Sequence, residues 1–306
     1  MDRAELDRLE ADLDTDRLPK VTPPPLFHYT DAAGLKGIIE KRTIWATDYR
    51  FLNDKREIRI GEDLLEDVAT KLAAEWRRGT PEHGLLTEFV ARFPEDRLTK
   101  IRSIYIASFS AEGDLLSQWR AYGATGGGYS LGLSHFSLPN TDEGAPIGAD
   151  LFPCEYHEER FRDEAEKRLR WLVANFSQAL ERFGTNALRE LTPRFVALLF
   201  RHAMFLALTF KHVAFEEERE WRLVGLADSR DPDVEVLFRP TIIGVVPYLE
   251  LPLTKPTDRL QIAKLYVGPM HEPERGCATA QLLLHRHGYR GDDLVAASSV
   301  PFRGTR

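Results

Sequence analysis

The stretch FHYTDAAGLKGIIEKRTIWATDYRFLND, residues 27–54, decides the fold class. The apolar residues 26–29 predict a strand, and Asp31 can cap the helix that follows. Apolar side chains recur along one face of that helix at Leu35, Ile38 and Ile39. A second short strand is predicted at 44–47. Strands predicted in both halves of the chain, with a helical insert between them, indicate an α+β protein.

The composition indicates a folded protein with a large core. The chain has 306 residues, of which 43% are hydrophobic and 10% aromatic, so it is long enough for one large domain or two ordinary ones. Its net charge of −7 argues against a general electrostatic grip on nucleic acid. Cys154 and Cys277 lack ligand-spaced partners, so we expect no disulfide scaffold and no metal site. This cysteine usage favours a reducing, cytoplasmic location.

We expect a polar N-terminal arm followed by one domain. Residues 1–25 predict an exposed, charged helix or a loose segment that ends at a run of three prolines. Residues 26–306 are expected to form a single domain, with a loop and a helical insert at about 137–212. The N-terminus lacks the order of a signal peptide, and no apolar run approaches the length of a membrane span. We therefore expect no membrane association.

Periodicity predicts the remaining elements. Helical patterns occupy 54–76, 114–123, 158–183, 187–212 and 274–286. Strand patterns occupy 104–110, 129–134, 220–225, 242–249, 264–267 and 294–300. Residues 79–100 are expected to be irregular or weakly helical.

Two polar and aromatic clusters near the start of the domain are candidate binding groups. Strand alternation puts His28 and Thr30 on one face and Tyr29 on the other. Taken alone, His28 fits a core histidine bonded to backbone better than it fits a ligand contact. Trp45 could offer a stacking face and Asn53 a polar contact. Core packing and helix capping explain that second cluster as well.

The helix LLSQWRAYG, residues 115–123, provides a third cluster. Leu115, Trp119 and Tyr122 fall on one helical face, a spacing typical of core packing. Ser117 lies off that face and could point into a neighbouring cleft. Binding and packing explain this cluster equally well.

The acidic stretch FEEEREWRLV, residues 215–224, is the strongest chemical signal. If a strand begins by Glu218, that residue and Glu220 share one face, and Arg222 follows on it. Neighbouring carboxylates repel each other, which lowers stability, so we expect such a pair to have a functional role. An exposed helix end explains the earlier glutamates well, but it explains Glu220, directly before an apolar strand, poorly.

The segments FHYT, IWATDYRFLND, SFS, DLLSQWRAYG, GYSLGL and EREWRL together resemble a widespread bacterial family of uncharacterised proteins. That family looks like a branch of the ADP-ribosyltransferase superfamily. The resemblance covers most of the chain from Leu26 onward and weakens over 137–210. It implies a split, mixed β-core of the ADP-ribosyltransferase type with a helical insert.

The resemblance also implies a site with a His–Tyr–Glu triad, as in the diphtheria toxin and poly(ADP-ribose) polymerase branch. His28 matches the histidine that holds NAD. Glu220 matches the catalytic glutamate, and Glu218 precedes it by two residues. The triad's middle aromatic stays open among Trp45, Trp119 and Tyr122. The residues expected to contact NAD are His28, Tyr29, Thr30, Trp45, Asn53, Ser117, Trp119, Tyr122 and Arg222.

The implied activity is NAD-dependent ADP-ribosyl transfer, in a toxin or a phage-defence effector. NAD is the substrate, and the macromolecular acceptor is an open choice between protein and nucleic acid. His28 and Thr30 are expected to form one wall of the NAD cleft and Glu220 the other. Two alternatives remain: an NAD glycohydrolase, and a non-catalytic nucleotide-sensing or interaction module on the same fold.

Overall fold

The chain divides into two compact units in the computed structural model. The helical unit comprises Met1–Lys20, Asn53–Ile101 and Cys154–Phe215, and the sheet unit comprises Val21–Leu52, Arg102–Pro153 and Glu216–Arg306. The structure describes residues 3–15, 21–52, 55–93, 103–122, 127–138, 147–227, 233–241, 244–270, 272–291 and 293–301. The mixed sheet and the many helices confirm the α+β class.

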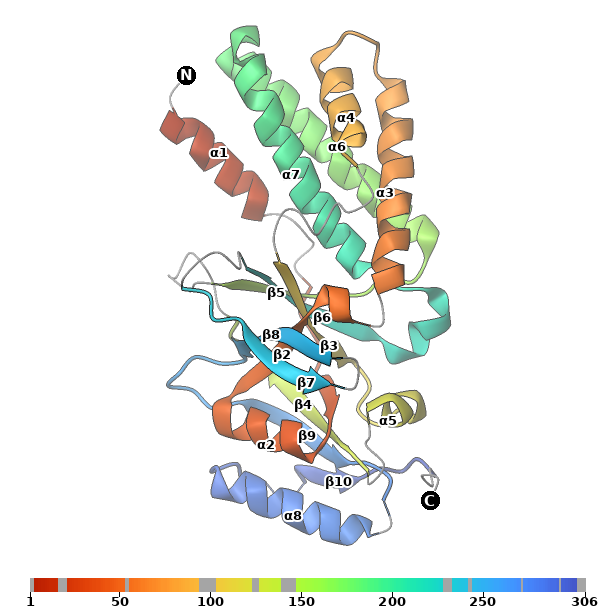
Figure 1. Ribbon diagram of the computed structural model, residues 1–306, viewed down its shortest axis with the longest axis vertical. Coiled ribbons are helices and arrows are strands. Elements are labelled where there is room, and N and C mark those ends of the chain that lie inside the picture. Colours follow the sequence, from red (N-terminus) through yellow and green to blue (C-terminus); the bar gives the residue numbers. More distant parts are fainter. Residues whose placement is uncertain are drawn as a thin grey trace. The chain divides into compact units, whose positions relative to one another are not determined.

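The helical unit packs its helices around α7 (Figure 1). Its helices are α1 (Arg3–Thr15), α3 (Lys55–Glu75), α4 (Pro81–Ala91), α6 (Glu158–Phe183) and α7 (Leu188–Thr209). A β-carbon at Gly61 of α3 would lie 3.0 Å from the carbonyl oxygen of Ala207 on α7. Glycine therefore allows the close approach of these two helices.

Contrary to the expectation that no apolar run approaches that length, one segment of the helical unit, Thr185–Thr209, is long and apolar enough to cross a membrane. Within its most apolar window, 67% of the residues are buried in the protein. Burial of this kind is what the core helix of a soluble protein shows. The expected cytoplasmic location stays a prediction.

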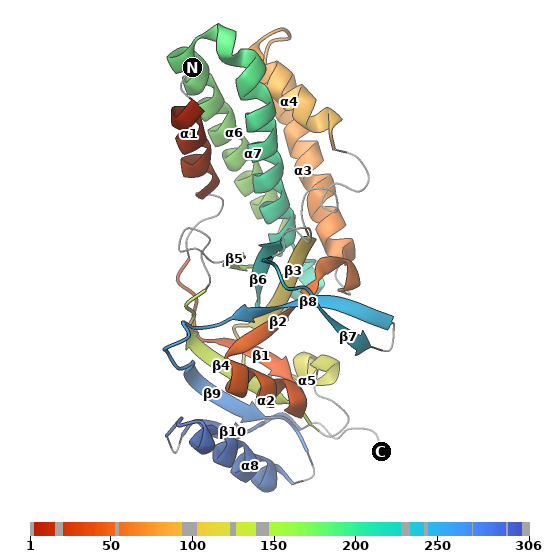
Figure 2. The same ribbon diagram turned by 60° about the vertical axis from the view of Figure 1, so that its left-hand side comes forward.

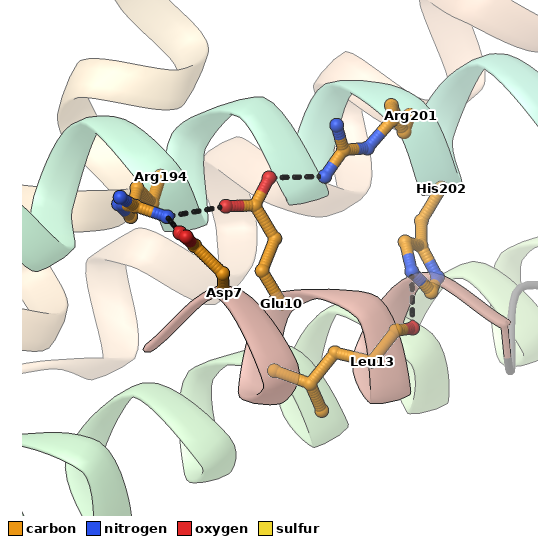
Figure 3. Close-up of polar contacts among 6 residues, drawn as sticks. All are labelled: Asp7, Glu10, Leu13, Arg194, Arg201 and His202. Atoms are coloured by element: carbon orange, nitrogen blue, oxygen red, sulfur yellow. Dashed lines mark hydrogen bonds and ion pairs between the residues drawn. The ribbon is translucent and has the colours of Figure 1, made fainter. Parts of the chain in front are cut away.

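The N-terminal segment forms a packed helix of the helical unit. Leu6 and Leu13 of α1 are buried, and α1 lies against α7. His202 of α7 donates a hydrogen bond from Nε2 to the carbonyl of Leu13, at 3.1 Å (Figure 3). This bond satisfies one of the carbonyl groups that the C-terminal turn of a helix leaves without an intrahelical partner.

Ion pairs add to this attachment of α1. Glu10 accepts hydrogen bonds from Arg194 at 3.0 Å and from Arg201 at 2.8 Å, and Arg194 also donates to Asp7 at 2.8 Å (Figure 3). A shared network of this kind fixes the register of α1 on α7 better than isolated surface pairs would. A helix is therefore observed over Arg3–Thr15, but it is packed into the helical unit, so the expectation of an exposed arm is wrong.

The sheet unit is built on a ten-stranded sheet (Figure 2). Its strands are β1 (Leu26–Thr30), β2 (Thr43–Asp48), β3 (Ser103–Ser110), β4 (Tyr129–His135), β5 (Gly148–Pro153), β6 (Glu220–Ala227), β7 (Leu237–Thr241), β8 (Gly244–Pro252), β9 (Gln261–Val267) and β10 (Val295–Ala297). The order is β10-β9-β4-β1-β3-β2-β8-β7, and β6 pairs with both β3 and β5. Only the β9–β10 pair among these described strands is parallel.

One face of this sheet forms the apolar core, on which α2 (Ala32–Lys41) and α8 (Pro273–Arg286) contribute buried side chains. The core includes Ile44, Ala46, Phe109, Trp221, Leu223, Leu249 and Leu251. The start of α2 is fixed as predicted, because the Asp31 carboxylate accepts a 2.7 Å bond from the Gly34 amide. Leu35, Ile38 and Ile39 of α2 are buried as predicted.

The two edges of β3 have different partners. The first edge pairs with β6 along its whole length, from Ser103 to Ser110. The other edge is shared, because β2 pairs with Tyr105 and Ile106 while β1 pairs with Ser110. Between these two partners lies Ser108. This division of the sheet between β1 and β2 positions the groups described below.

The structure differs from the sequence expectation in four places. Residues 79–100, expected to be irregular or weakly helical, contain α4, which begins after the N-cap Thr80. Two strands were not predicted: β5 lies partly in the expected loop, and β7 forms a hairpin with β8. The helical unit draws on three stretches of chain, where one insert at about 137–212 was expected.

Candidate functional site

Strand register gathers polar side chains on the face of the sheet opposite the apolar core. Ser110 lies opposite Glu220, and Ser108 lies opposite Arg222. Directly opposed residues point to the same side, and every second residue along a strand returns to it. The same rule, followed through β2, β8 and β7, adds Thr47 and Arg239. We name this surface the polar face and define it by Thr47, Ser108, Ser110, Glu220, Arg222 and Arg239.

Glu220 lies within a buried ion pair on the polar face. Its Oε1 atom accepts a bond from Arg222 Nε at 2.9 Å and another from the Ser108 hydroxyl at 2.8 Å. The exposed fraction is 4% for Glu220 and 2% for Arg222. Charged groups this deeply buried are held only where other groups compensate them. The carboxylate predicted from sequence is therefore fixed at the first residue of β6.

The second predicted carboxylate, Glu218, lies outside the strand. It ends the 3-10 helix η5 (Val213–Glu218), and β6 begins at Glu220. Arg219 between them adopts the left-handed conformation with φ +42° and turns the chain. Glu218 and Glu220 consequently do not share a strand face as expected. The Glu218 carbonyl instead accepts a 2.6 Å bond from the Ser110 hydroxyl.

His28 lies at the opening of the sheet. Its Nδ1 donates to the carbonyl of Ser108 at 2.9 Å, and its ring centroid lies 5.6 Å from that of Phe109. Burial lowers the pKa of His28 and the charge of Arg239 lowers it further, while the bond to Ser108 raises it. The ring is therefore held in its neutral form near pH 7.

The register separates His28 from the polar face. Phe27 lies opposite Ser110 and so shares the face of Glu220, which puts the next residue, His28, on the core side. Ser108 links the two residues: its carbonyl accepts a hydrogen bond from His28, and its hydroxyl donates one to Glu220. The expectation that His28 faces Glu220 across a cleft is therefore wrong.

Tyr29 is a buried anchor for the start of α5 (Leu116–Tyr122). Its hydroxyl donates to the Glu112 carbonyl and accepts from the Leu115 amide, both at 2.9 Å. Burial raises the pKa of Tyr29 well above its ordinary value. Its neighbour Thr30 ends β1 half-buried, with its hydroxyl close against Gly34 of α2. Both residues hold local structure in the sheet unit.

The α5 cluster divides between core and surface. Trp119 is buried and donates from Nε1 to Asp114 at 2.7 Å, whereas Tyr122 is 53% exposed, contrary to the predicted apolar stripe. The Ser117 hydroxyl is buried and has no hydrogen-bond partner among the described residues. Ser298 also donates to Asp114, at 2.5 Å. These bonds hold the pKa of Asp114 below its usual value although burial raises it.

A hollow lies beside Ser298, and Glu220 is not among the residues that line it. Its lining includes the polar Ser298 and the apolar residues Met270, Pro273 and Pro301. Trp119 packs against the adjacent Gly268, where a β-carbon would lie 2.9 Å from the indole ring. None of the side chains that define the polar face lines this hollow, so it is a feature separate from the candidate site.

Trp45 belongs to an aromatic and cationic cluster at the β2 end of the polar face. The residue is 43% exposed, and its ring centroid lies 4.6 Å from that of Tyr248. The Arg239 guanidinium lies 5.5 Å from the Trp45 ring and 5.8 Å from the Tyr248 ring. Arg239 also donates to the Thr47 hydroxyl at 2.7 Å. Of the other predicted site residues, Asn53 lies outside the described residues.

Sequence reasoning missed Arg239. It lies in β7, a strand at the end of the sheet order that contains Pro240. Proline within a short run argues against a strand and is tolerated at edges, so no strand was predicted here. The sequence signal for this strand was that Leu237, Arg239 and Thr241 occupy alternate positions, as on one face of a strand, just before the strand predicted at 242–249.

The described residues contain no group of three or more His, Cys, Asp or Glu side chains that could hold a metal ion. The expectation of a site without a metal stays a prediction. What the polar face offers chemically is one buried carboxylate, two arginines and several hydroxyl groups.

A family model described as "Protein of unknown function (DUF2971)" matches residues 118–223. The matched segment is less than half of the chain and runs from α5 into β6, so it includes Glu220 and Arg222. No curated protein and no solved structure matches this chain.

Proposed function

We propose that this protein is an NAD-dependent ADP-ribosyltransferase and that Glu220 is its catalytic carboxylate. The supporting observation is the placement of Glu220 at the first residue of β6, where Arg222 and Ser108 both donate to one of its oxygens. A carboxylate held by two donors within a strand keeps one orientation, which is what a positioned catalytic group needs.

The proposed chemistry needs one well-placed negative charge. When the bond between nicotinamide and ribose breaks, nicotinamide leaves with the bonding electrons and the ribose carbon becomes oxocarbenium-like. A carboxylate beside the ribose stabilises that positive charge in the transition state. The acceptor then attacks the same carbon, forms the new bond to it and loses its proton to solvent. Glu220 supplies the charge in this proposal.

His28 acts as a positioning residue in this proposal. Its ring is held at the sheet opening by the bond to Ser108, and the same serine bonds to Glu220. The lowered pKa keeps the imidazole neutral, with Nδ1 donating to Ser108, so His28 acts on Glu220 through this serine from the core side of the sheet.

The burial of Glu220 favours a second candidate function. An exposed fraction of 4% and a direct bond to Arg222 are also features of a structural ion pair. In that case the protein is a non-catalytic module that binds a nucleotide on the same fold. Nicotinamide release separates the two functions, because a binding module releases none.

The test measures nicotinamide released from labelled NAD by the full chain mixed with cell extract. We expect release by the native protein and its loss in Glu220→Gln, which keeps the side-chain size but removes the charge. Glu217→Gln is the matched control, because Glu217 is an exposed carboxylate nearby in η5. Undiminished release by a folded Glu220→Gln protein would falsify the catalytic assignment.

Product analysis then identifies the acceptor. ADP-ribose recovered on protein or nucleic acid identifies a transferase and its acceptor class, which a toxin or a phage-defence effector would need. Free ADP-ribose as the sole product identifies an NAD glycohydrolase. Thermal stabilisation by NAD without any release identifies the binding module.

A further inference from the structure

Most N–H groups of Arg239 make no hydrogen bond to the described residues. A guanidinium has five N–H donors, and the hydrogen bond observed for Arg239 is the one to Thr47. Its Nε is buried and has no hydrogen-bond partner among the described residues. Burial lowers the pKa of Arg239, and among the described residues no carboxylate offsets that effect. This environment contrasts with that of Arg222, which has a carboxylate at 2.9 Å.

The nearest carboxylate in register is already engaged. Glu250 lies opposite Trp45 across the β2–β8 pair. Its Oε1 accepts from Trp45 Nε1 at 3.0 Å and from Lys41 at 2.6 Å. This arrangement leaves the positive charge of Arg239 available to an anion from outside the chain.

Two aromatic rings hold the guanidinium in place. Trp45 and Tyr248 lie within cation–π range of Arg239 and restrict its plane. A planar fork fixed in this way suits two oxygens of a phosphate. Trp45 is 43% exposed, so this aromatic residue also offers a stacking surface for a base.

We infer that Arg239, Trp45 and Thr47 form a subsite that binds the diphosphate of a nucleotide, with Arg239 on the phosphate oxygens and Trp45 against the base. Thr47 holds the guanidinium from the β2 side through its hydroxyl. Binding at this subsite follows from the geometry around Arg239. Its assignment to the diphosphate of NAD rests on the proposed function.

The experiment titrates the full chain with ADP and with adenosine and measures both dissociation constants by calorimetry. We expect Arg239→Gln to weaken ADP binding about 10- to 100-fold, as the loss of a charged hydrogen bond does, and to leave adenosine binding unchanged. Trp45→Leu should weaken both ligands. Arg259→Gln is the matched control, because Arg259 is an exposed arginine of the sheet unit that donates to the Gly288 carbonyl.

The results separate the subsite from the catalytic proposal. An Arg239-dependent ADP affinity supports the subsite even if NAD is never cleaved. Equal ADP affinity in native protein and folded Arg239→Gln, or no ADP binding by native protein at millimolar concentration, overturns it even if nicotinamide is released. If Arg239→Gln does not fold, Arg239→Lys takes its place. That variant keeps the charge but loses the planar fork, and an unchanged ADP affinity in it would also overturn the subsite.

Discussion

Arg222 and Leu223 are neighbours on β6 that point to opposite faces of one sheet. Arg222 is 2% exposed and pairs with Glu220 on the polar face, whereas Leu223 is fully buried in the apolar core. Apolar burial stabilises a fold wherever shapes match, but buried charges stabilise it only when each has its partner. Burying the charged groups of the polar face therefore costs more free energy than burying the apolar core. This cost is the reason to look for function on the polar face.

The largest expected effect comes from leaving Glu220 without its partner. Arg222→Met should lower the free energy of unfolding by about 3–5 kcal/mol, because it leaves a buried carboxylate uncompensated. Urea denaturation measures this loss. The double variant Glu220→Leu/Arg222→Met should recover part of it, since no unpaired charge remains. A double variant less stable than Arg222→Met alone would contradict this account of the polar face.

The matched change on the apolar face is Leu223→Ala. It should cost about 2–5 kcal/mol through lost burial and the cavity that remains. Nucleotide binding per folded molecule should stay as in the native protein, because Leu223 points away from the polar face. Weaker ADP binding by the folded fraction of this variant would break the distinction between the two faces.

A smaller effect is expected at Ser108. Ser108→Ala removes the 2.8 Å hydroxyl bond to Glu220 but keeps the carbonyl bond to His28. We expect a loss of about 1.5–3 kcal/mol, the range for hydrogen bonds to charged groups. Thermal unfolding monitored by circular dichroism measures it. An unchanged melting temperature would mean that the Ser108 hydroxyl is not needed to hold Glu220.

The smallest effect is a pH dependence at His28. Its pKa in the folded protein lies below 6.5, the ordinary value for histidine, so below pH 6.5 the unfolded chain binds more protons than the folded protein. Stability is then full above pH 6.5 and falls toward the folded pKa by up to about 1.4 kcal/mol per pH unit. His28→Gln should flatten that slope between pH 5 and 7, and equal slopes in both proteins would contradict the neutral histidine.

Much of the fold follows from local patterns in the sequence. The strands at 26–29 and 129–134 and the Asp31 cap were predicted because alternation and capping are local signals. The face of each strand was not, because it depends on pairing between distant segments. The single pair Phe27–Ser110 reverses the expected sides of His28 and Tyr29 relative to Glu220.

The candidate site shows the same limit. Glu220 was found because a charged residue directly before an apolar strand is unusual in sequence. Arg239 was missed because its neighbours in space, Trp45 and Tyr248, lie on other strands. An arginine without a carboxylate partner cannot be recognised from a single segment, since the pairing that it lacks is a tertiary property.

The central claim is that catalysis belongs to the polar face, and its most direct test compares the two faces in one assay. Nicotinamide release from NAD is measured for native protein, Glu220→Gln and Leu223→Ala, each scaled to its folded fraction. We predict a loss of about 100-fold or more in Glu220→Gln and a native rate in Leu223→Ala. Equal rates in native protein and Glu220→Gln, or no release by the native protein, would contradict the claim.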